Sequence, residues 1–374
     1  MTGPRRTVKL DSGGAGAPGI VFPASGIGGP LVPELTKIGQ GLADTIDAKV
    51  AALNESETYP EHPTRIAAIE THMSWVFLTG RHAYKLKKPV RYEFLDFSTI
   101  EARRYDCEEE LRLNRRLAPD VYLEIVPLTA DGGMRIGGTG EIVDWLVKMR
   151  RLPAGGTLQD AIRTGTWTDN DIRRVAGLLG RFYNNAARVE IGFAEYRERF
   201  YRDIRANLTE LANPAHRLPA GQAQRVHAAQ LDFLERRKDL FDARVRERRI
   251  VEAHGDLRPE HVYPGPEPLI TDCLEFNLQF RTLDPADELA FLAMECDRLG
   301  APAIGPLLFG AYRDITGDRP PDALVRFYKG VRACLRAKLA LWHLREPVVR
   351  EPQKWPALAA DYLRLADDNA LRLS

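Results

Sequence analysis

HGDLRPEH, residues 254–261, is the stretch of sequence that decides the fold of this 374-residue chain. Before it, residues 249–253 predict a short strand, and after it residues 261–263 and 269–271 predict a hairpin around a Pro-Gly-Pro turn. Asp272 is expected at the exit of that hairpin. The carboxylates of Asp256 and Asp272 are therefore expected at one end of a small β element.

Paired carboxylates of this kind suit phosphoryl transfer. One carboxylate orients or deprotonates an acceptor hydroxyl, and the other holds Mg²⁺ on the phosphates. The glycines near the N-terminus offer no alternative phosphate site, because the motif G-x-x-x-x-G-K-[ST] occurs nowhere in the chain. The sequence thus favours a carboxylate-based site over a P-loop ATPase.

The rest of the chain is β-rich first and helical second. Strands are predicted by short apolar runs, which occupy residues 74–78, 83–86, 121–128, 134–136 and 142–149. Apolar spacing predicts a helix over 34–54, and a capping box of Ser98 and Glu101 predicts another helix that runs to Ala118. After residue 156 the pattern is helical almost to the end, apart from residues 250–284.

Composition excludes several classes of protein. Lys and Arg total 53 against 52 for Asp and Glu, so no overall field points to nucleic acid or an anionic membrane as a partner. The four cysteines are far apart and contain no C-x-x-C pair, which predicts reduced thiols rather than a zinc site or disulfides. The basic start lacks a following apolar stretch, so a cytoplasmic location is expected.

The motifs together resemble a known family. HGDLRPEH is similar to the catalytic loop H-R-D-x-x-x-x-N of protein kinases, and the Gly after the His is closer to aminoglycoside-phosphotransferase-like kinases. Within that family the chain resembles a largely uncharacterised bacterial subgroup, of which some members carry an additional P-loop domain. The segments that carry this resemblance are IETHMSWVFL, YKLKKPV, FLDFSTIEARR, LRLNRRLAP and DELAFLAMECDRLG.

The resemblance implies an α+β, protein-kinase-like two-lobe fold with a small β-rich lobe and a larger helical lobe. Residues 1–33 are expected to be a disordered Gly/Pro-rich tail, and 34–147 a helix followed by the ATP-binding lobe. Residues 148–152 would be the hinge, and 153–374 the helical lobe with the catalytic loop and substrate pocket. The implied activity is transfer of phosphate from ATP, with Mg²⁺, to a hydroxyl of a small molecule.

The family motifs assign roles around the catalytic loop. Asp256 matches the catalytic base, and Asp272 matches the metal-binding Asp of D-F-G, although Cys and Leu follow it here. Arg258 takes the place of a cation that neutralises the transferred phosphoryl group. Asp287 matches an acidic residue that supports the loop.

The same comparison assigns the nucleotide site. Lys85, in Ala-Tyr-Lys, matches the lysine that pairs with the ATP phosphates, and Lys87 is its rival because residues two apart on a strand share a face. We expect Lys87 to be an exposed strand lysine. Glu110 is expected to hold Lys85, since it flanks the apolar stripe of its helix whereas Glu109 points away.

Adenine is expected at the hinge, near Met149. No glycine-rich loop precedes the first hairpin, so Thr71, His72 and Ser74 are the candidates for covering the phosphates, with ordinary turn roles as the alternative. A basic row in a late helix is expected to be a solvated face rather than a substrate site; it comprises Lys329, Arg332, Arg336 and Lys338.

Two histidines leave alternatives open. His261 stands where kinases place a metal-binding Asn, and it would bind metal through water, orient Asp256, or mark weakened catalysis, because Mg²⁺ prefers oxygen ligands. A nucleotide-binding pseudokinase is therefore the alternative function. A metallohydrolase using His254, Asp256 and His261 is a further alternative, although His254 is expected to pack and hydrogen-bond. The acceptor and the oligomeric state are not encoded in any recognisable motif.

Overall fold

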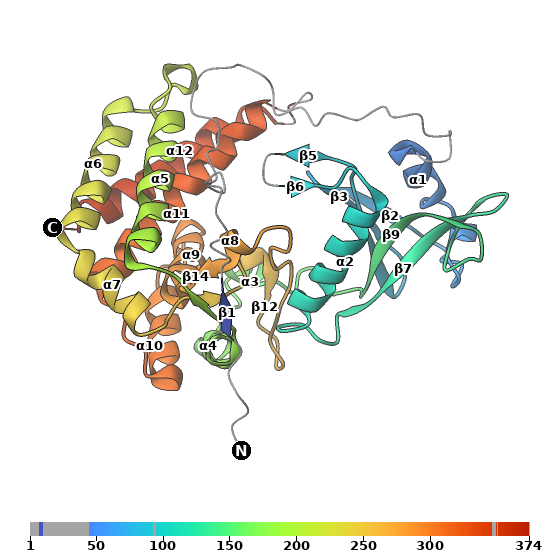
Figure 1. Ribbon diagram of the computed structural model, residues 1–374, viewed down its shortest axis with the longest axis horizontal. Coiled ribbons are helices and arrows are strands. Elements are labelled where there is room, and N and C mark those ends of the chain that lie inside the picture. The colour runs from blue at the N-terminus through green and yellow to red at the C-terminus, as the bar shows by residue number, and fades with distance from the viewer. Residues whose placement is uncertain (1–6, 10–44, 93–94, 346–348, 350, 374) are drawn as a thin grey trace. The chain divides into compact units, whose positions relative to one another are not determined.

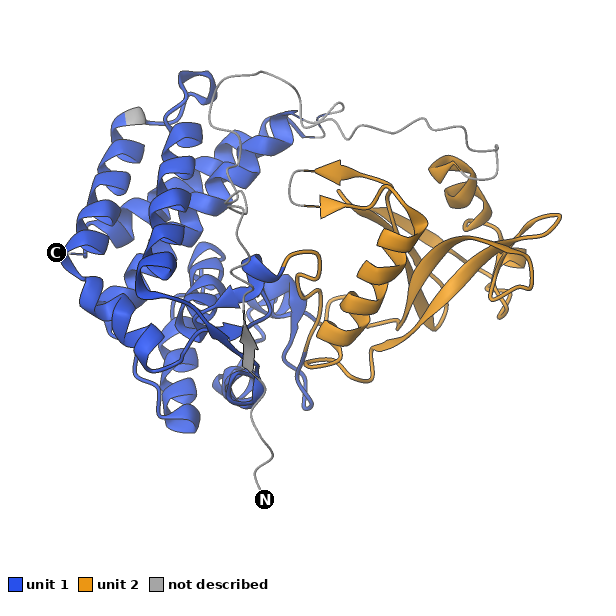
Figure 2. Ribbon diagram, in the orientation of Figure 1, with its two compact units in different colours: residues 1–32, 157–269, 278–374 blue, residues 33–156, 270–277 orange. Residues whose placement is uncertain are grey.

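The computed structural model describes residues 7–9, 45–92, 95–345, 349 and 351–373, which fall into two compact units (Figure 2). Unit 2 comprises residues 33–156 together with the short segment 270–277. Unit 1 comprises residues 1–32, 157–269 and 278–374. The segment that contains Asp272 therefore belongs structurally with the first part of the chain, although it follows the catalytic loop in sequence.

Unit 2 is built on a six-stranded antiparallel sheet of order β2-β3-β4-β9-β7-β8 (Figure 1). Its strands are β2 (Ala67–Glu70), β3 (Ser74–Leu78), β4 (His82–Lys87), β7 (Tyr122–Ala130), β8 (Met134–Ile136) and β9 (Glu141–Arg150). The predicted hairpin and the three later strands are confirmed, with ends that differ by up to two residues. A two-stranded ribbon, β5 (Arg91–Tyr92) with β6 (Leu95–Asp96), completes the strands of this unit.

Alternation along β4 sorts its side chains onto two faces. Tyr84 and Leu86 join the apolar core, which also contains Leu53 just after helix α1 (Ile46–Ala52). Lys85 and Lys87 lie on the opposite face of the strand. Helix α2 (Ile100–Asn114) packs on β7 and β9, and it supplies the acidic partners of both lysines.

A buried carboxylate ties the two helices of unit 2 to its sheet. Asp144 on β9 accepts from Arg103 of α2, with N···O distances of 2.9 and 2.8 Å, and from Lys49 of α1 at 2.8 Å. Only 1% of the Asp144 side chain is exposed. Because removing one partner from a buried ion pair leaves an uncompensated charge, this network fixes the position of α2 on the sheet.

The start of α2 differs from the prediction. Its N-cap is Thr99, whose hydroxyl accepts from the amide of Ala102, while Ser98 bonds instead to Asp96. The predicted N-cap was therefore one residue too early, and Ala102 at the third helical position has no side-chain acceptor to complete a capping box. The helix ends at Asn114 rather than Ala118. The helix predicted over 34–54 is present as α1, and its first part lies outside the described residues.

Unit 1 is mainly helical, as predicted. Its α-helices are α3 (Leu158–Thr164), α4 (Asp169–Asn185), α5 (Phe193–Leu211), α6 (Ala220–Arg236), α7 (Lys238–Arg246), α8 (Leu278–Arg281), α9 (Pro285–Arg298), α10 (Ile304–Thr316), α11 (Asp322–Trp342) and α12 (Lys354–Ala370). Helix α9 is buried from Pro285 to Cys296, and α10, α11 and α12 pack against it. An almost wholly buried helix is expected to be apolar all round, so each acidic residue on α9 requires a partner.

Short strands carry the catalytic loop of unit 1. A four-stranded sheet has the order β1-β10-β11-β14, and β12 and β13 form a separate pair. The bounds of these strands are β1 (Thr7–Lys9), β10 (Arg188–Glu190), β11 (Val251–Glu252), β12 (Val262–Tyr263), β13 (Leu269–Ile270) and β14 (Thr282–Leu283). Residues 7–9 pair with β10 in parallel. The other residues of 1–33 lie outside the described part.

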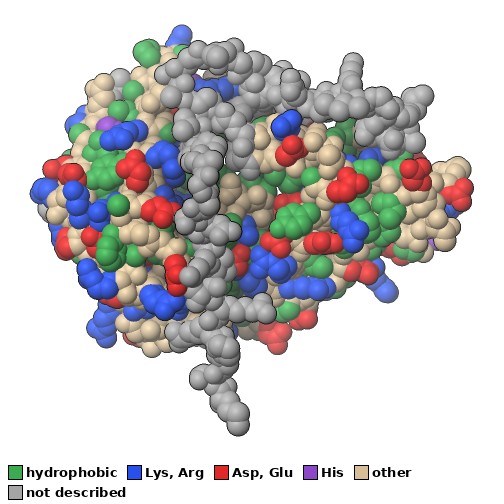
Figure 3. Space-filling model, in the orientation of Figure 1, with side chains coloured by type: hydrophobic (Ala, Val, Ile, Leu, Met, Phe, Trp, Pro, Cys, Tyr) green, Lys and Arg blue, Asp and Glu red, His purple; other side chains and the backbone are tan. Residues whose placement is uncertain are grey.

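Several general expectations can be compared with the structure. All four cysteines are buried free thiols, as predicted. In Figure 3, basic and acidic side chains are interspersed over the visible face, which agrees with the balanced composition. Within the described ranges, every helix is too short or too polar to span a bilayer.

Candidate active site

The predicted pair of Lys85 and Glu110 is present in unit 2. Lys85 on β4 and Glu110 on α2 are joined by a hydrogen bond of 2.8 Å between Nζ and Oε1. The same ammonium lies 3.2 Å from Oδ1 of Asp272. Lys85 remains 15% exposed, whereas Glu110 is 1% exposed. Three residues that lie far apart in sequence and were assigned to nucleotide and metal binding are thus in contact.

Lys87 is not the exposed lysine that was predicted. Its side chain is 1% exposed, and its ammonium lies 2.7 Å from Glu110, 2.5 Å from Asp106 and 2.6 Å from Glu275. The prediction that Lys85 and Lys87 share a face was right. The burial was missed because it depends on α2 and on the distant segment 270–277, which neither strand alternation nor residue type reveals.

Asp272 adopts a left-handed backbone conformation, with φ of 62°. Such a conformation is uncommon for residues other than Gly, and Asp and Asn tolerate it best. Two contacts hold it: the amide of Asp272 donates to the hydroxyl of Tyr122 at 3.1 Å, and the next amide, that of Cys273, donates to Asn114 at 2.8 Å. The Asp272 side chain is half exposed, so it can reach a ligand.

The electrostatics of this cluster are governed by burial and by the two lysines. Burial lowers the pKa of Lys85 and of Lys87, but their carboxylate neighbours outweigh it and raise both values well above the ordinary one. Burial would raise the pKa of Glu110, but the two lysines hold it below its usual range. Burial raises the pKa of Glu275 to about 7 against the opposing effect of Lys87. Glu110 is therefore firmly ionised, whereas burial raises the pKa of both Glu275 and Asp106.

The catalytic loop of unit 1 is held by Glu288 on α9. This buried carboxylate accepts from the amides of His254, at 3.1 Å, and Gly255, at 2.5 Å, and from the hydroxyl of Tyr183 at 2.8 Å. Gly255 has φ of 92°, which requires glycine. The predicted support residue, Asp287, instead pairs with Arg332 at 2.8 Å. The prediction was therefore wrong by one position.

Asp256 is ion-paired within its own loop. Arg258 contacts Asp256 at 2.9 Å and Glu260 at 2.5 Å. Burial disfavours the charge on Arg258, but the two carboxylates outweigh it and raise its pKa above the ordinary value. The Asp256 side chain is 29% exposed. The loop thus presents an accessible carboxylate next to a guanidinium.

The hydrogen bonds of the two loop histidines indicate their tautomers. Nδ1 of His254 accepts from the amide of Asp256 at 3.2 Å, and Nδ1 of His261 donates to the Asp256 carbonyl at 2.9 Å. Nε2 of His261 lies 3.3 Å from Nη2 of Arg258 and can only accept from it. His261 therefore braces the loop, and the adjacent guanidinium opposes a metal at Nε2. His254 packs and hydrogen-bonds, in agreement with its predicted role.

This arrangement disfavours a transition-metal centre. The tautomer of His254 leaves a proton rather than a lone pair on Nε2. In the part of the chain that the structure describes, no group of three or more His, Cys, Asp or Glu side chains is arranged to hold a metal ion. The metallohydrolase alternative, which required His254, Asp256 and His261 as ligands, has no geometric support.

The remaining predicted nucleotide contacts lie in unit 2. Thr71, His72 and Ser74 lie at the turn between β2 and β3. The Thr71 hydroxyl accepts from the amide of Ser74 at 3.0 Å, and His72 stacks on Tyr92. These contacts give all three residues turn-stabilising roles. Met149 lies near the end of β9, opposite Ala83, and a cavity of about 610 Å³ adjoins that end; it is lined by Gly80, Arg81, His82, Leu123, Arg150, Arg151, Leu152 and Pro153.

The basic row of α11 is not a solvated face. Arg332 and Lys338 are buried, and Arg336 donates to Glu295 of α9 at 3.0 Å. Lys329 pairs with Asp297 at 2.7 Å. The prediction was wrong because α11 packs against α9, whose acidic residues need these cations.

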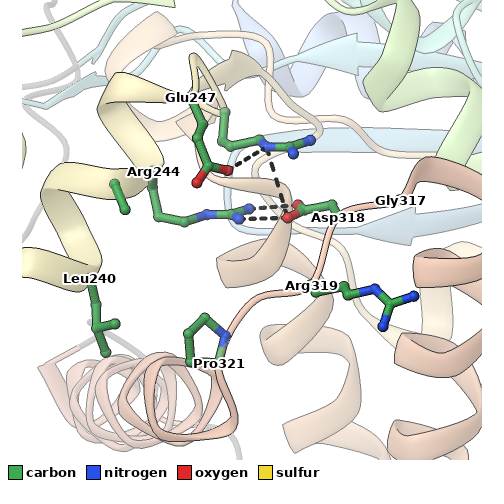
Figure 4. A pocket seen from close by; sticks show the side chains of 9 residues that line it. Leu240, Arg244, Glu247, Gly317, Asp318, Arg319 and Pro321 are labelled. Atoms are coloured by element: carbon green, nitrogen blue, oxygen red, sulfur yellow. Dashed lines mark hydrogen bonds and ion pairs between the residues drawn. The ribbon is translucent and has the colours of Figure 1, made fainter.

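A pocket of about 290 Å³ in unit 1 is shown in Figure 4. Its floor is Arg244, which makes bonds of 2.6 Å to both oxygens of Asp318 and of 2.7 Å to both oxygens of Asp284. Asp284 is also the N-cap of α9. Arg249 lies 3.8 Å from Asp318, so two guanidinium groups balance the two carboxylates, and the pocket is a structural junction rather than a second reactive site.

Comparison with known proteins identifies relatives that the chain matches over only part of their length. No protein-family model matches the chain. Uncharacterised proteins of Mycobacterium tuberculosis (strain H37Rv) and Mycobacterium bovis are 34% identical over 304 residues. The match covers 79% of this chain but 57% of each relative. The chain therefore spans little more than half the length of these curated relatives.

Solved structures reveal the fold. A choline/ethanolamine kinase family protein from Mesorhizobium loti matches with a TM-score of 0.51 and 15% identity, covering 87% of this chain and 98% of that one. Choline kinase from Cryptosporidium parvum matches with a TM-score of 0.50 and 9% identity, covering 86% and 96%. At such identities the likeness establishes the fold alone. The predicted α+β, protein-kinase-like fold is confirmed.

Proposed function

We propose that this protein is an ATP-dependent phosphotransferase that acts on a hydroxyl of a small molecule. The observation that carries the proposal is the contact of Lys85 with both Glu110 and Asp272. In phosphoryl transfer by kinases, a lysine held by a helix glutamate places the phosphates, and an aspartate holds the metal. The protein-kinase-like fold supports this interpretation, and so does the order of these residues along the chain.

Unit 2 supplies the groups that place ATP. Lys85 keeps part of its side chain exposed while its ammonium is bonded to Glu110, so the ammonium is suited to contact phosphate oxygens. Asp272 is the metal-binding residue in this proposal. A single half-exposed carboxylate fits Mg²⁺, which usually retains waters and is held by one or two carboxylates plus the substrate phosphates. When bound, Mg²⁺ would neutralise charge on those phosphates.

Unit 1 supplies the groups that act on the acceptor. Asp256 would orient or deprotonate the acceptor hydroxyl, and its side chain is 29% exposed and therefore accessible for that task. Arg258 also lies where a guanidinium would neutralise charge on the transferred phosphoryl group. Met149 and the turn of Thr71, His72 and Ser74 are proposed to contact the adenine and the phosphates.

The chemical nature of the acceptor is argued from the motif after the metal-binding residue. Cys273 and Leu274 follow Asp272, in place of the Phe and Gly of protein kinases. This departure favours a small-molecule acceptor over a protein. The name choline/ethanolamine kinase, carried by structures of the same fold, is consistent with a hydroxylated metabolite. We propose that the protein works in the cytoplasm, without a nucleic-acid or membrane partner.

Calorimetric titration with ATP tests the nucleotide half of this proposal. We expect binding in the presence of Mg²⁺ and a large loss of affinity in Asp272→Asn, which removes the metal-binding charge. Asn suits the left-handed backbone at this position, so the variant should remain folded. Absence of ATP binding to the wild-type protein with either Mg²⁺ or Mn²⁺ would refute the proposal.

A second candidate function is a nucleotide-binding pseudokinase. It is favoured by His261, whose ring nitrogens are bonded to the Asp256 carbonyl and to Arg258, so a second metal ligand of the usual kind is missing. This candidate predicts ATP binding without phosphoryl transfer to any acceptor. Transfer to one compound, lost in Asp256→Asn, would eliminate it.

A further inference from the structure

The second buried lysine of β4, Lys87, has a set of contacts that the proposed reaction does not use directly. An ammonium has three N–H donors, and three carboxylate oxygens surround that of Lys87 within 2.7 Å. The ring of Phe97 lies over the same ammonium, 5.3 Å from its centroid. Lys87 donates hydrogen bonds to Glu110 and Glu275 and pairs with Asp106, and because only 1% of its side chain is exposed a nucleotide cannot reach it.

Lys87 and Lys85 divide the carboxylate of Glu110 between them. Lys85 bonds to Oε1 at 2.8 Å, and Lys87 bonds to Oε2 at 2.7 Å. Lys87 therefore fixes the rotation of the carboxylate that in turn fixes Lys85. A carboxylate held on both oxygens has little freedom to follow a moving partner, so Lys85 is positioned through Lys87.

Lys87 also fastens the segment that carries Asp272. It bonds to Glu275, three residues further along, while Asp106 and Glu110 reach it from α2. The next residue, Phe276, packs with the apolar side chains of Val90, Leu95 and Phe97. One ammonium thus joins strand β4, helix α2 and the segment 270–277.

We propose that Lys87 is a positioning residue that locks α2 and the segment 272–276 to β4, and so holds Lys85 and Asp272 in the geometry that binds MgATP. The inference rests on the proposed function, since it concerns the same site. It assigns different tasks to the two lysines: Lys85 contacts the nucleotide, and Lys87 acts only through Glu110 and Glu275.

The test compares Lys87→Met with Lys85→Met and with Lys238→Met, which removes an exposed ion pair on α7. We expect Lys87→Met to weaken MgATP binding in calorimetry by about 10- to 100-fold, as loss of an outer-shell partner commonly does. We also expect faster hydrogen exchange in residues 272–277 and in α2. Lys238→Met should match the wild type in both measurements.

A compensated variant separates positioning from charge balance. Lys87→Met combined with Glu275→Gln removes one positive and one negative charge, so it should recover thermal stability even where Lys87→Met folds poorly. If Lys87 is a positioning residue, MgATP affinity stays low in this double variant. Recovery of wild-type affinity, or wild-type affinity in Lys87→Met itself, would overturn the proposal.

Failure of the proposed function would be recognised separately. If the wild-type protein does not bind MgATP, the phosphotransferase proposal fails, and the hydrogen-exchange measurement still decides the role of Lys87. Unchanged exchange of residues 272–277 in both Lys87 variants would show that the segment is held by other contacts, and the positioning role would be refuted.

Discussion

Asp256 is the residue on which the proposed chemistry depends most. Its carboxylate is accessible and lies 2.9 Å from the guanidinium of Arg258, while its backbone bonds to His254 and His261 on either side. The two histidines therefore fix the loop conformation, and Arg258 pairs with the Asp256 carboxylate. Neither histidine needs to take part in the chemical step for the loop to be arranged in this way.

We predict that Asp256→Asn lowers phosphoryl transfer about 10²- to 10⁴-fold, the range expected for loss of a general base. The amide keeps the shape of the side chain but cannot accept the proton. MgATP affinity, measured by calorimetry, should change little because Lys85 and Asp272 lie in unit 2. A variant with wild-type turnover would remove Asp256 from the mechanism.

The contrast between Lys85 and Lys87 shows how much of a residue's environment can be predicted from the sequence. The match to Ala-Tyr-Lys and the alternation of a strand were sufficient to place both lysines on one face and to choose Glu110 over Glu109. Burial of Lys87 was not predictable, because two of its partners, Asp106 and Glu275, have no signature of their own. The role of Glu275 follows only from a contact that spans 188 positions of sequence, and that of Asp106 from the contact between α2 and β4.

At the scale of elements, helix α2 supplies acidic side chains to the proposed nucleotide site. Four titratable groups surround Glu275: Lys85 and Lys87 on β4, and Asp106 and Glu110 on α2. Burial raises the pKa of Glu275 to about 7 from an ordinary value of 4.5. The folded protein therefore binds a proton between pH 4.5 and about 7 that the unfolded chain releases.

Because the pKa of Glu275 is higher in the folded protein than in the unfolded chain, we predict that its contribution to stability falls as pH rises from 4.5 to about 7. Glu275→Gln should remove that slope and be more stable than the wild type at pH 8.5, by at most about 3 kcal/mol. Thermal unfolding at pH 5.5 and 8.5 checks it, with Glu108→Gln on the exposed face of α2 as the control. An identical pH dependence in Glu275→Gln and the wild type would contradict the assignment.

Helix α9 plays the matching part in unit 1 by holding the catalytic loop. Its first turn contains Asp287 and Glu288. Asp287 was predicted to support the loop, but Glu288 is the residue that does so. Adjacent residues on a helix point in different directions, so the choice depends on how α9 is rotated in the core. The cap of α9 by Asp284 and the pair of Asp287 with Arg332 set that rotation.

We predict that Glu288→Gln destabilises the protein by about 1–3 kcal/mol, because a neutral amide oxygen replaces the charged acceptor of the buried His254 and Gly255 amides. Turnover should fall as well, since the loop that presents Asp256 would lose its anchor. Thermal unfolding and the transfer rate check this, with the exposed Glu195→Gln of α5 as the control. Loss of stability without loss of turnover would confine Glu288 to a structural role.

At the scale of the whole molecule, the order of elements was more predictable than their contacts. Strands of short apolar runs, the hairpin of β3 and β4, and the helical second part all follow from local pattern and were predicted. The basic residues of α11 were interpreted as solvated because a row of charges on a helix is usually an exposed face. Their partners on α9, such as Glu295, are brought close only by helix packing.

The assignment of the proposed catalytic residues to two different units also could not be predicted from the order of the motifs. Asp272 follows the catalytic loop by only a few residues, yet segment 270–277 belongs to unit 2 with Lys85 and Glu110. Asp256 and Arg258 belong to unit 1. Asp272→Asn in unit 2 and Asp256→Asn in unit 1 are therefore each expected to abolish the proposed reaction.

Phosphoryl transfer from labelled ATP to a library of hydroxylated metabolites tests the central claim most directly. The proposal predicts that at least one compound is phosphorylated in the presence of Mg²⁺ and that both Asp256→Asn and Asp272→Asn abolish the product. If the wild-type protein binds MgATP but phosphorylates no compound, or if Asp256→Asn forms the product at the wild-type rate, the protein is not the phosphotransferase proposed.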